Sequence, residues 1–131
     1  PKIAGRAFSI TARIKPDKNN GVIIAQGGAR HGYAIYLHQG NLIFAVRIDG
    51  KLTVARSKAP DGATRIEATL DKSGKLTLRI DGTEVATAQA ASTIPNQPGD
   101  PLSVGRDIDS PVGDYEAPNE FLGTIDEVRI D

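Results

Sequence analysis

The chain has 131 residues, 39% of them hydrophobic and 24% charged, which is typical of a globular domain with one hydrophobic core. The 16 lysine and arginine residues balance 16 aspartate and glutamate residues, so no net field gathers nucleic acid. No apolar run approaches the ~18 residues of a membrane span, and the absence of cysteine excludes disulfides, thiolate zinc sites and a cysteine nucleophile.

The first two predicted strands differ in pattern. In residues 7–15 apolar side chains alternate with polar ones, and this period of two predicts a strand buried on one face. A turn-rich segment follows at residues 16–21. The short apolar run 22–25 predicts a strand covered on both faces, and the pair Gly27-Gly28 ends it.

Hairpins dominate the middle of the chain. Residues 33–38 alternate in polarity, and the alternation resumes at residues 42–48 after a turn, which predicts a hairpin. Further strands are predicted at residues 51–56, 66–70, 76–80 and 84–89. The pairs Asp49-Gly50 and Asp81-Gly82 favour tight turns with two positive φ angles. Their flanking segments are near-copies, which we interpret as recurrent hairpin chemistry because a repeat array needs ~3 or more units.

The last third of the chain is less regular. A loop rich in proline and glycine leads to a short strand at residues 102–104, and the irregular segment 105–120 precedes a final strand at residues 121–130. Residues 86–91 are compatible with a single helical turn. About ten short strands separated by turns indicate an antiparallel sandwich or barrel. Phe8, Phe44 and Phe121 are predicted to lie in its core.

The sequence predicts no catalytic residues. Both histidines, His31 and His38, adjoin predicted turns and are interpreted as solvated, and no Gly-x-Ser-x-Gly nucleophile motif is present. Glycoside hydrolysis needs two carboxyl groups that face one cleft. The only dense pair, Asp126 and Glu127, is adjacent, so in a regular strand the two side chains would point to opposite faces.

The acidic residues of segment 105–120 form the most site-like feature. Calcium takes six to eight hard oxygen ligands from flexible loops. The candidate ligands are Asp107, Asp109, Asp114 and Glu116, with Glu120 and Asn119 nearby. A merely solvated acidic loop is the alternative interpretation.

The second candidate site is a carbohydrate-binding face, which would use aromatic and cationic side chains. Tyr36 and His38 share a strand face opposite Tyr33, so this face could offer them to a ligand. If Arg47 and Arg79 belong to the same sheet, they could hold a sulfated or otherwise anionic glycan. The other exposed aromatic expected near such a groove is Tyr115. An ordinary polar sheet face is the alternative.

Four segments carry a family resemblance. Residues 8–12, 82–85, 104–107 and 121–130 resemble the laminin-G-like branch of the concanavalin A-like lectin and glucanase fold. The resemblance covers nearly the whole chain and is most specific in the last segment. It implies an all-β, antiparallel two-sheet sandwich of the jelly-roll type, formed by residues 1–131 as one domain.

A narrower resemblance concerns residues 21–28, 32–36 and 105–115, which together are similar to the C-terminal accessory domain of bacterial arylsulfatases. It implies a secreted or periplasmic parent enzyme whose catalytic domain lies upstream and is the partner of this module. The sulfatase nucleophile signature, cysteine or serine followed by x-Pro-x-Arg, is absent, so no catalytic residue carries over. The start at Pro1 and the end after a predicted strand also favour a fragment of a longer chain.

Three functions follow as hypotheses. The first is a non-catalytic accessory module of a hydrolase, which predicts an exposed apolar patch of a few hundred Å2 where the partner is missing. The second is a carbohydrate-binding module, which predicts an exposed Tyr36 or Tyr115 in a polar groove. The third is a glycosidase, which predicts two carboxyl groups at roughly 5 to 9.5 Å in a cleft.

Overall fold

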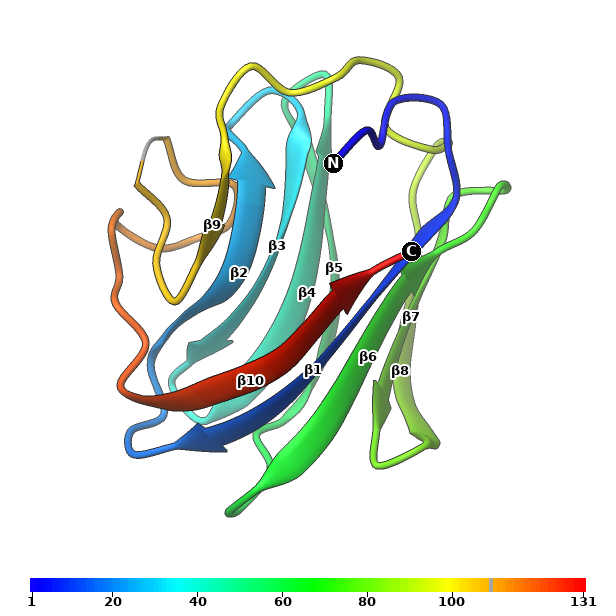
Figure 1. Ribbon diagram of the computed structural model, residues 1–131. Helices are drawn as coiled ribbons and strands as arrows, with labels where there is room; N and C mark the ends of the chain where they lie inside the picture. Colours follow the sequence, from blue (N-terminus) through cyan, green and yellow to red (C-terminus); the bar gives the residue numbers. More distant parts are fainter. Residues whose placement is uncertain (109) are drawn as a thin grey trace.

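The chain folds into two antiparallel sheets that pack face to face, as the computed structural model of residues 1–108 and 110–131 shows (Figure 1). Five strands form each sheet, in the orders β10-β1-β6-β7-β8 and β5-β4-β3-β2-β9. The strands are β1 (Phe8–Pro16), β2 (Gly21–Gly27), β3 (Gly32–His38), β4 (Asn41–Ile48), β5 (Lys51–Lys58), β6 (Thr64–Leu70), β7 (Lys75–Ile80), β8 (Thr83–Gln89), β9 (Leu102–Val104) and β10 (Gly123–Ile130). The two-sheet sandwich predicted from the sequence is confirmed.

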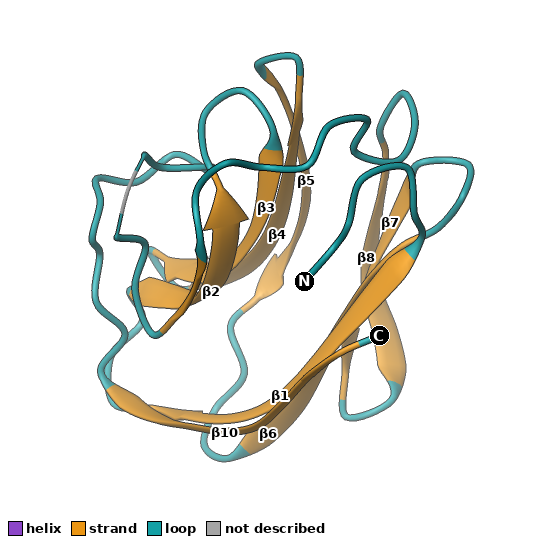
Figure 2. Cartoon of the chain, turned by 45° about the horizontal axis from the view of Figure 1, so that its top comes forward, coloured by secondary structure: helices purple, strands orange, loops and turns teal. Residues whose placement is uncertain are grey.

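Within the described residues, loops alone connect the strands (Figure 2). In the described part of the chain no helix is long and apolar enough to cross a membrane. The single helical turn expected at residues 86–91 is wrong, because residues up to Gln89 belong to β8 and pair with β7. Alternate residues of β8 pack against the core, and this tertiary contact outweighs the helical preference of alanine.

Tight turns set the register of the hairpins. Asp49 and Asp81 have φ angles of 49° each, and the glycines that follow them have φ angles of 79° and 81°. Two successive positive φ angles match the right-handed twist of the flanking strands. The hairpins β4-β5 and β7-β8 therefore turn as the Asp-Gly pairs predicted.

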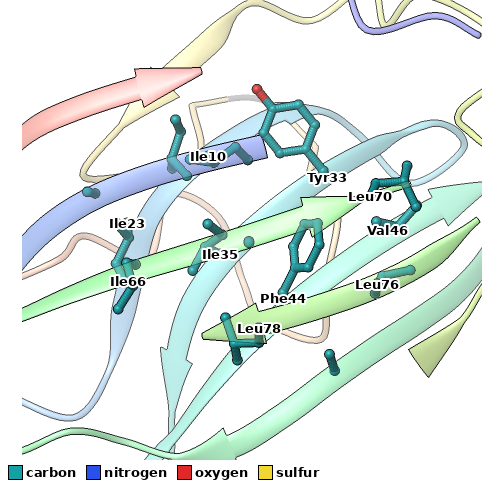
Figure 3. Packing of buried hydrophobic residues seen from close by; sticks show 14 of the residues in the cluster. Ile10, Ile23, Tyr33, Ile35, Phe44, Val46, Ile66, Leu70, Leu76 and Leu78 are labelled. Atoms are coloured by element: carbon teal, nitrogen blue, oxygen red, sulfur yellow. The ribbon is translucent and has the colours of Figure 1, made fainter. Parts of the chain in front are cut away.

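The main core lies between the sheets and consists of the inward-facing side chains of both (Figure 3). Ile10, Ile66, Leu70, Leu76 and Leu78 from one sheet meet Ile23, Tyr33, Ile35, Phe44 and Val46 from the other. The rings of Phe8 and Tyr33 lie 5.0 Å apart between centroids. Phe8, Phe44 and Phe121 are all buried, which confirms the sequence prediction.

A second apolar layer covers the outer face of β2, β3 and β4. We call this outer face, formed by Val22, Ala25, Ala34, Tyr36, Ile43 and Ala45, the covered face. Residues 105–108 and 110–120, which we call the cover loop, contribute Val112 and Tyr115 to it. The cover loop runs beside β2 and β9 as the orange trace in Figure 1. The run at residues 22–25 is thus buried on both faces, as predicted.

A bulge interrupts the pairing of β1 with β10. Thr11 pairs with Arg129 and Arg13 with Asp126, so two residues of β10 oppose Ala12 alone. Glu127, the first of the two, has a φ angle of 53°, in the left-handed region that non-glycine residues seldom occupy. Strand β10 is therefore not regular at Asp126 and Glu127, and both side chains are exposed instead of facing opposite layers.

Candidate functional site

Tyr36 is buried at the centre of the covered face, with 1% of its surface exposed. Its ring meets that of Tyr115 edge-on at 4.8 Å, and its hydroxyl oxygen accepts a hydrogen bond from the Asp114 amide (3.3 Å). A Cβ on Gly113 would lie only 2.5–2.7 Å from the Tyr36 ring, so glycine allows this close approach. The exposure expected for Tyr36 as a stacking platform is therefore wrong, because the cover loop occupies the face.

A buried carboxylate fixes the cover loop internally. Asp107 is 3% exposed, and its Oδ2 accepts a hydrogen bond from the Tyr115 hydroxyl at 2.5 Å. Burial, followed by the hydrogen bond and charge of Asp107, raises the pKa of Tyr115 far above its ordinary range. The Tyr115 hydroxyl thus stays protonated and donates a hydrogen bond to Asp107. The Tyr115 side chain is half-exposed.

The predicted calcium ligands are not brought together in the described part of the chain. Asp107 binds Tyr115, whereas Asp114 and Glu116 are exposed, and Asp109 lies outside the described residues. Among residues 1–108 and 110–131, no three acidic or histidine side chains form a group that could hold a metal ion. A calcium site in this loop stays a prediction that depends on Asp109.

The remaining predicted ligand residues do not converge on one site. Arg47 lies on β4 and donates from Nε to the Val112 carbonyl oxygen (2.7 Å), which holds the cover loop in place. Arg79 lies on β7 of the other sheet and pairs with Glu67 at 3.1 Å, so the condition for a joint anion site with Arg47, that both lie in one sheet, is not met. His38, at the end of β3, is half-exposed opposite Asn41.

The structure instead offers a cavity at one end of the second sheet. Gly27 pairs with Gly32 and Gln26 pairs with Leu102, so the connections at residues 28–31 and 97–101 leave the sheet side by side. Together with Ser110 they line a cavity of about 220 Å3, which we call the rim cavity. Its lining residues are Gly28, Ala29, Arg30, His31, Gln97, Pro98, Gly99, Asp100 and Ser110.

Polar groups converge inside the rim cavity. The Ser110 hydroxyl donates to Asp100 Oδ2 at 3.1 Å. The Arg30 side chain is 81% exposed, and its guanidinium lies 3.5 Å from Asp49 Oδ1. A Cβ on Gly28 would lie 1.9 Å from Ser110 Oγ, so glycine at this point lets the Ser110 hydroxyl take its position beside Asp100. The rim cavity therefore presents a carboxylate, a hydroxyl and a cation to one ligand.

His31 forms a fixed wall of the rim cavity. Its side chain is 9% exposed, its Nδ1 accepts a hydrogen bond from the Asp49 amide (3.4 Å), and Asn96 Nδ2 lies 3.2 Å from its Nε2. The interpretation of His31 as a solvated turn residue is therefore wrong. Sequence analysis also missed Asp100 and Ser110, for which the only signal was that polar loops follow β2 and precede β9.

A family model described as the concanavalin A-like lectin/glucanases superfamily, of the laminin G type, matches residues 1–130. The chain belongs to this superfamily. No curated protein matches the sequence. The laminin-G-like fold expected from the sequence is thereby confirmed for the whole matched range.

Solved structures share this laminin-G-like fold at low sequence identity. Domains LG4-5 of the mouse laminin alpha1 chain superpose with a TM-score of 0.81, 19% identity and 95% of this chain covered. The LG1-3 region of the laminin alpha2 chain superposes with a TM-score of 0.71, 19% identity and 100% of this chain covered. The receptor binding domain of botulinum neurotoxin type G superposes with a TM-score of 0.68, 14% identity and 95% of this chain covered. This chain spans 35%, 29% and 34% of those three chains, about a third of each.

The cavities of this laminin-G-like domain differ from the cleft of a glycoside hydrolase in their carboxylates. Each of three cavities on the described residues is lined by one carboxylate. The rim cavity contains Asp100, and the two cavities on the other sheet contain Glu127 and Asp126, respectively. Hydrolysis of a glycosidic bond uses two carboxyl groups in one cleft. The arrangement of the rim cavity is suited to holding hydroxyl groups, since carboxylates accept and guanidinium groups donate hydrogen bonds.

Proposed function

We propose that this domain is a non-catalytic carbohydrate-binding module that holds a sugar residue in the rim cavity. The observation that carries the proposal is the pair of Asp100 and Ser110, joined by a hydrogen bond of 3.1 Å inside the rim cavity and seated against Gly28. A sugar hydroxyl both donates and accepts, so it matches a carboxylate beside a hydroxyl. Arg30 adds a cation for an anionic substituent.

The fold relatives support a binding role. The superfamily name includes lectins, and the botulinum neurotoxin relatives are receptor binding domains. The covered face supports the choice of the rim, because Tyr36 and Ile43 are buried there and unavailable to a ligand. Among the described residues that line the rim cavity there is no tyrosine, tryptophan or phenylalanine, so selectivity would come mainly from hydrogen bonds.

A glycan array followed by titration calorimetry with the retained glycan tests the proposal. Replacing Asp100 by Asn removes a charge-assisted acceptor, so we expect binding to weaken about tenfold. Gly28→Ala places a methyl group where the Ser110 hydroxyl lies, so it should displace that hydroxyl from Asp100 and weaken binding. Asp61→Asn, on an exposed loop elsewhere, is the matched control. Equal affinities of the Asp100→Asn and Asp61→Asn variants would contradict the proposal, as would an array without any retained glycan.

A second role concerns the protein in which the module works. We propose that it is the accessory module of a secreted or periplasmic hydrolase, an arylsulfatase, with the catalytic domain as its partner. Support comes from the sequence resemblance of residues 21–28, 32–36 and 105–115 to the accessory domain of arylsulfatases. In the fold these segments contact one another through Val22, Tyr36 and Val112. The full reading frame tests this role. An upstream sulfatase domain would support it, and an upstream chain without one would contradict it.

A further inference from the structure

A second hollow lies on the outer face of the other sheet, where β10, β1 and β6 run side by side (Figure 1). Its volume is about 200 Å3. The lining residues are Thr11, Ala12, Arg13, Arg65, Glu127 and Arg129. Three arginines thus face one carboxylate in a chain whose net charge is zero, so the hollow is a local positive site on a neutral molecule.

Two of the arginines oppose each other directly. Arg13 pairs with Arg65 across β1 and β6, and like charges at this position destabilise a sheet. In the described residues no carboxylate lies within ion-pair distance of Arg65. Arg13 reaches Glu127 only at 3.8 Å, between side chains that are 59% and 64% exposed. Arg129 pairs with Asp131 at 3.0 Å, between side chains that are 74% and 56% exposed. Among the described residues, Arg65 is therefore the arginine of the hollow whose charge no carboxylate compensates.

The bulge in β10 forms one wall of this hollow. Glu127 has a φ angle of 53°, and the register shift places Arg129 opposite Thr11 and beside the two opposed arginines. Bulges redirect side chains and commonly occur beside functional sites. Backbone strain at a non-glycine residue and a contact between two like charges thus occur at the same place.

We propose that this hollow binds a tetrahedral oxyanion, namely a sulfate or phosphate group. Guanidinium groups donate paired hydrogen bonds to such oxygens, and three of them can contact one group from three strands. The Thr11 hydroxyl, which also lines the hollow, adds a further donor. A planar carboxylate offers only two oxygens and would engage fewer of these donors. The site lies on a different sheet from the rim cavity and does not depend on it.

NMR titration of the whole chain tests the proposal, with sodium sulfate and sodium phosphate added at constant ionic strength. Glucose 6-sulfate and glucose 6-phosphate form the second arm, which distinguishes an esterified group from the free ion. We expect saturable shifts of the arginine side-chain signals with one ion bound. The Arg65→Gln variant should bind about tenfold more weakly, and Arg65→Lys, which keeps the charge but loses the paired donors, should fall between.

Arg56→Gln, at an exposed position on the other sheet, is the matched control and should bind like the unchanged chain. If the shifts saturate with the sodium salts and with the glucose esters alike, the hollow is an oxyanion site that accepts the free ion. If they saturate with the esters alone, it is an oxyanion site that requires a substituted ligand. Shifts that rise without saturation in both arms would overturn the proposal. Equal affinities of the Arg65→Gln and Arg56→Gln variants would also overturn it.

Discussion

The outer faces of the two sheets have opposite characters. On the covered face, Ala34, Tyr36 and Ile43 are buried beneath the cover loop, and the face works as a second core. On the opposite outer face, Arg13 and Arg65 are exposed, and no comparable apolar layer is present among the described residues. The comparison teaches that alternation assigns residues to a face, whereas the loops decide whether that face is open to a ligand.

The largest effect is expected from emptying the covered face. Tyr36→Ala removes a buried ring together with its contact to Tyr115, so we expect a loss of about 3–5 kcal/mol in the free energy of unfolding. Arg13→Ala on the open face should change it by less than about 0.5 kcal/mol. Urea denaturation measures both. Similar small losses in the two variants would show that the cover loop does not pack as described.

A methyl group beneath the cover loop sharpens the comparison. Gly113→Ala forces a Cβ to within 2.5–2.7 Å of the Tyr36 ring atoms, so we expect destabilisation of about 1–3 kcal/mol. Gly99→Ala is the matched control, since its Cβ would meet nothing within 4 Å. The midpoints of urea unfolding should therefore separate the two variants, and coinciding midpoints would argue against a tightly seated loop.

Alkaline pH probes the buried tyrosines. Burial raises the pKa of Tyr33 and Tyr36 above the ordinary value of 10.0, so both keep their protons in the folded chain after the unfolded chain has lost them. The stability they contribute is present below pH 10 and falls as the pH rises above it. Each such tyrosine contributes a decline of about 1.4 kcal/mol per pH unit. Tyr36→Phe should therefore show a shallower decline, and parallel curves would contradict burial of its hydroxyl.

The smallest effect concerns the open face. Arg65→Gln relieves the contact with Arg13, so we expect stability to rise by about 0.2–1 kcal/mol at low salt. Arg79→Gln on the same sheet loses its pairing with Glu67 and should lower stability slightly. Thermal unfolding at low and high salt measures both differences. A loss of stability in the Arg65→Gln variant would mean that Arg65 stabilises the fold, and would contradict a destabilising repulsion between Arg13 and Arg65.

Much of the fold could be predicted because its signals are local. Alternation predicted β1, and the Asp-Gly pairs predicted the turns before β5 and β8. The apolar run at residues 22–25 correctly indicated a strand covered on both faces. The same signal was present in β3 and β4, which are also apolar on both faces, but alternation with His38 and Arg47 obscured it.

The site could not be predicted because it depends on contacts between distant segments. Tyr36 is covered by residues more than 70 positions away, and no local pattern reveals that contact. Arg47 and Arg79 have similar local sequences, yet the crossing from β5 to β6 places them in different sheets. The rim cavity likewise joins Gly28 to Asp100 and Ser110 through the pairing of β2 with β9.

The central claim is that ligands reach this domain at the rim cavity and not at the covered face. Mapping amide shifts by NMR during titration with the glycan retained on the array tests it most directly. We predict that shifts concentrate at Gly28, Arg30, Asp100 and Ser110. Shifts concentrated instead at Tyr36, Ile43 and Ala45 would contradict the claim, because they would show that the cover loop opens to admit the ligand.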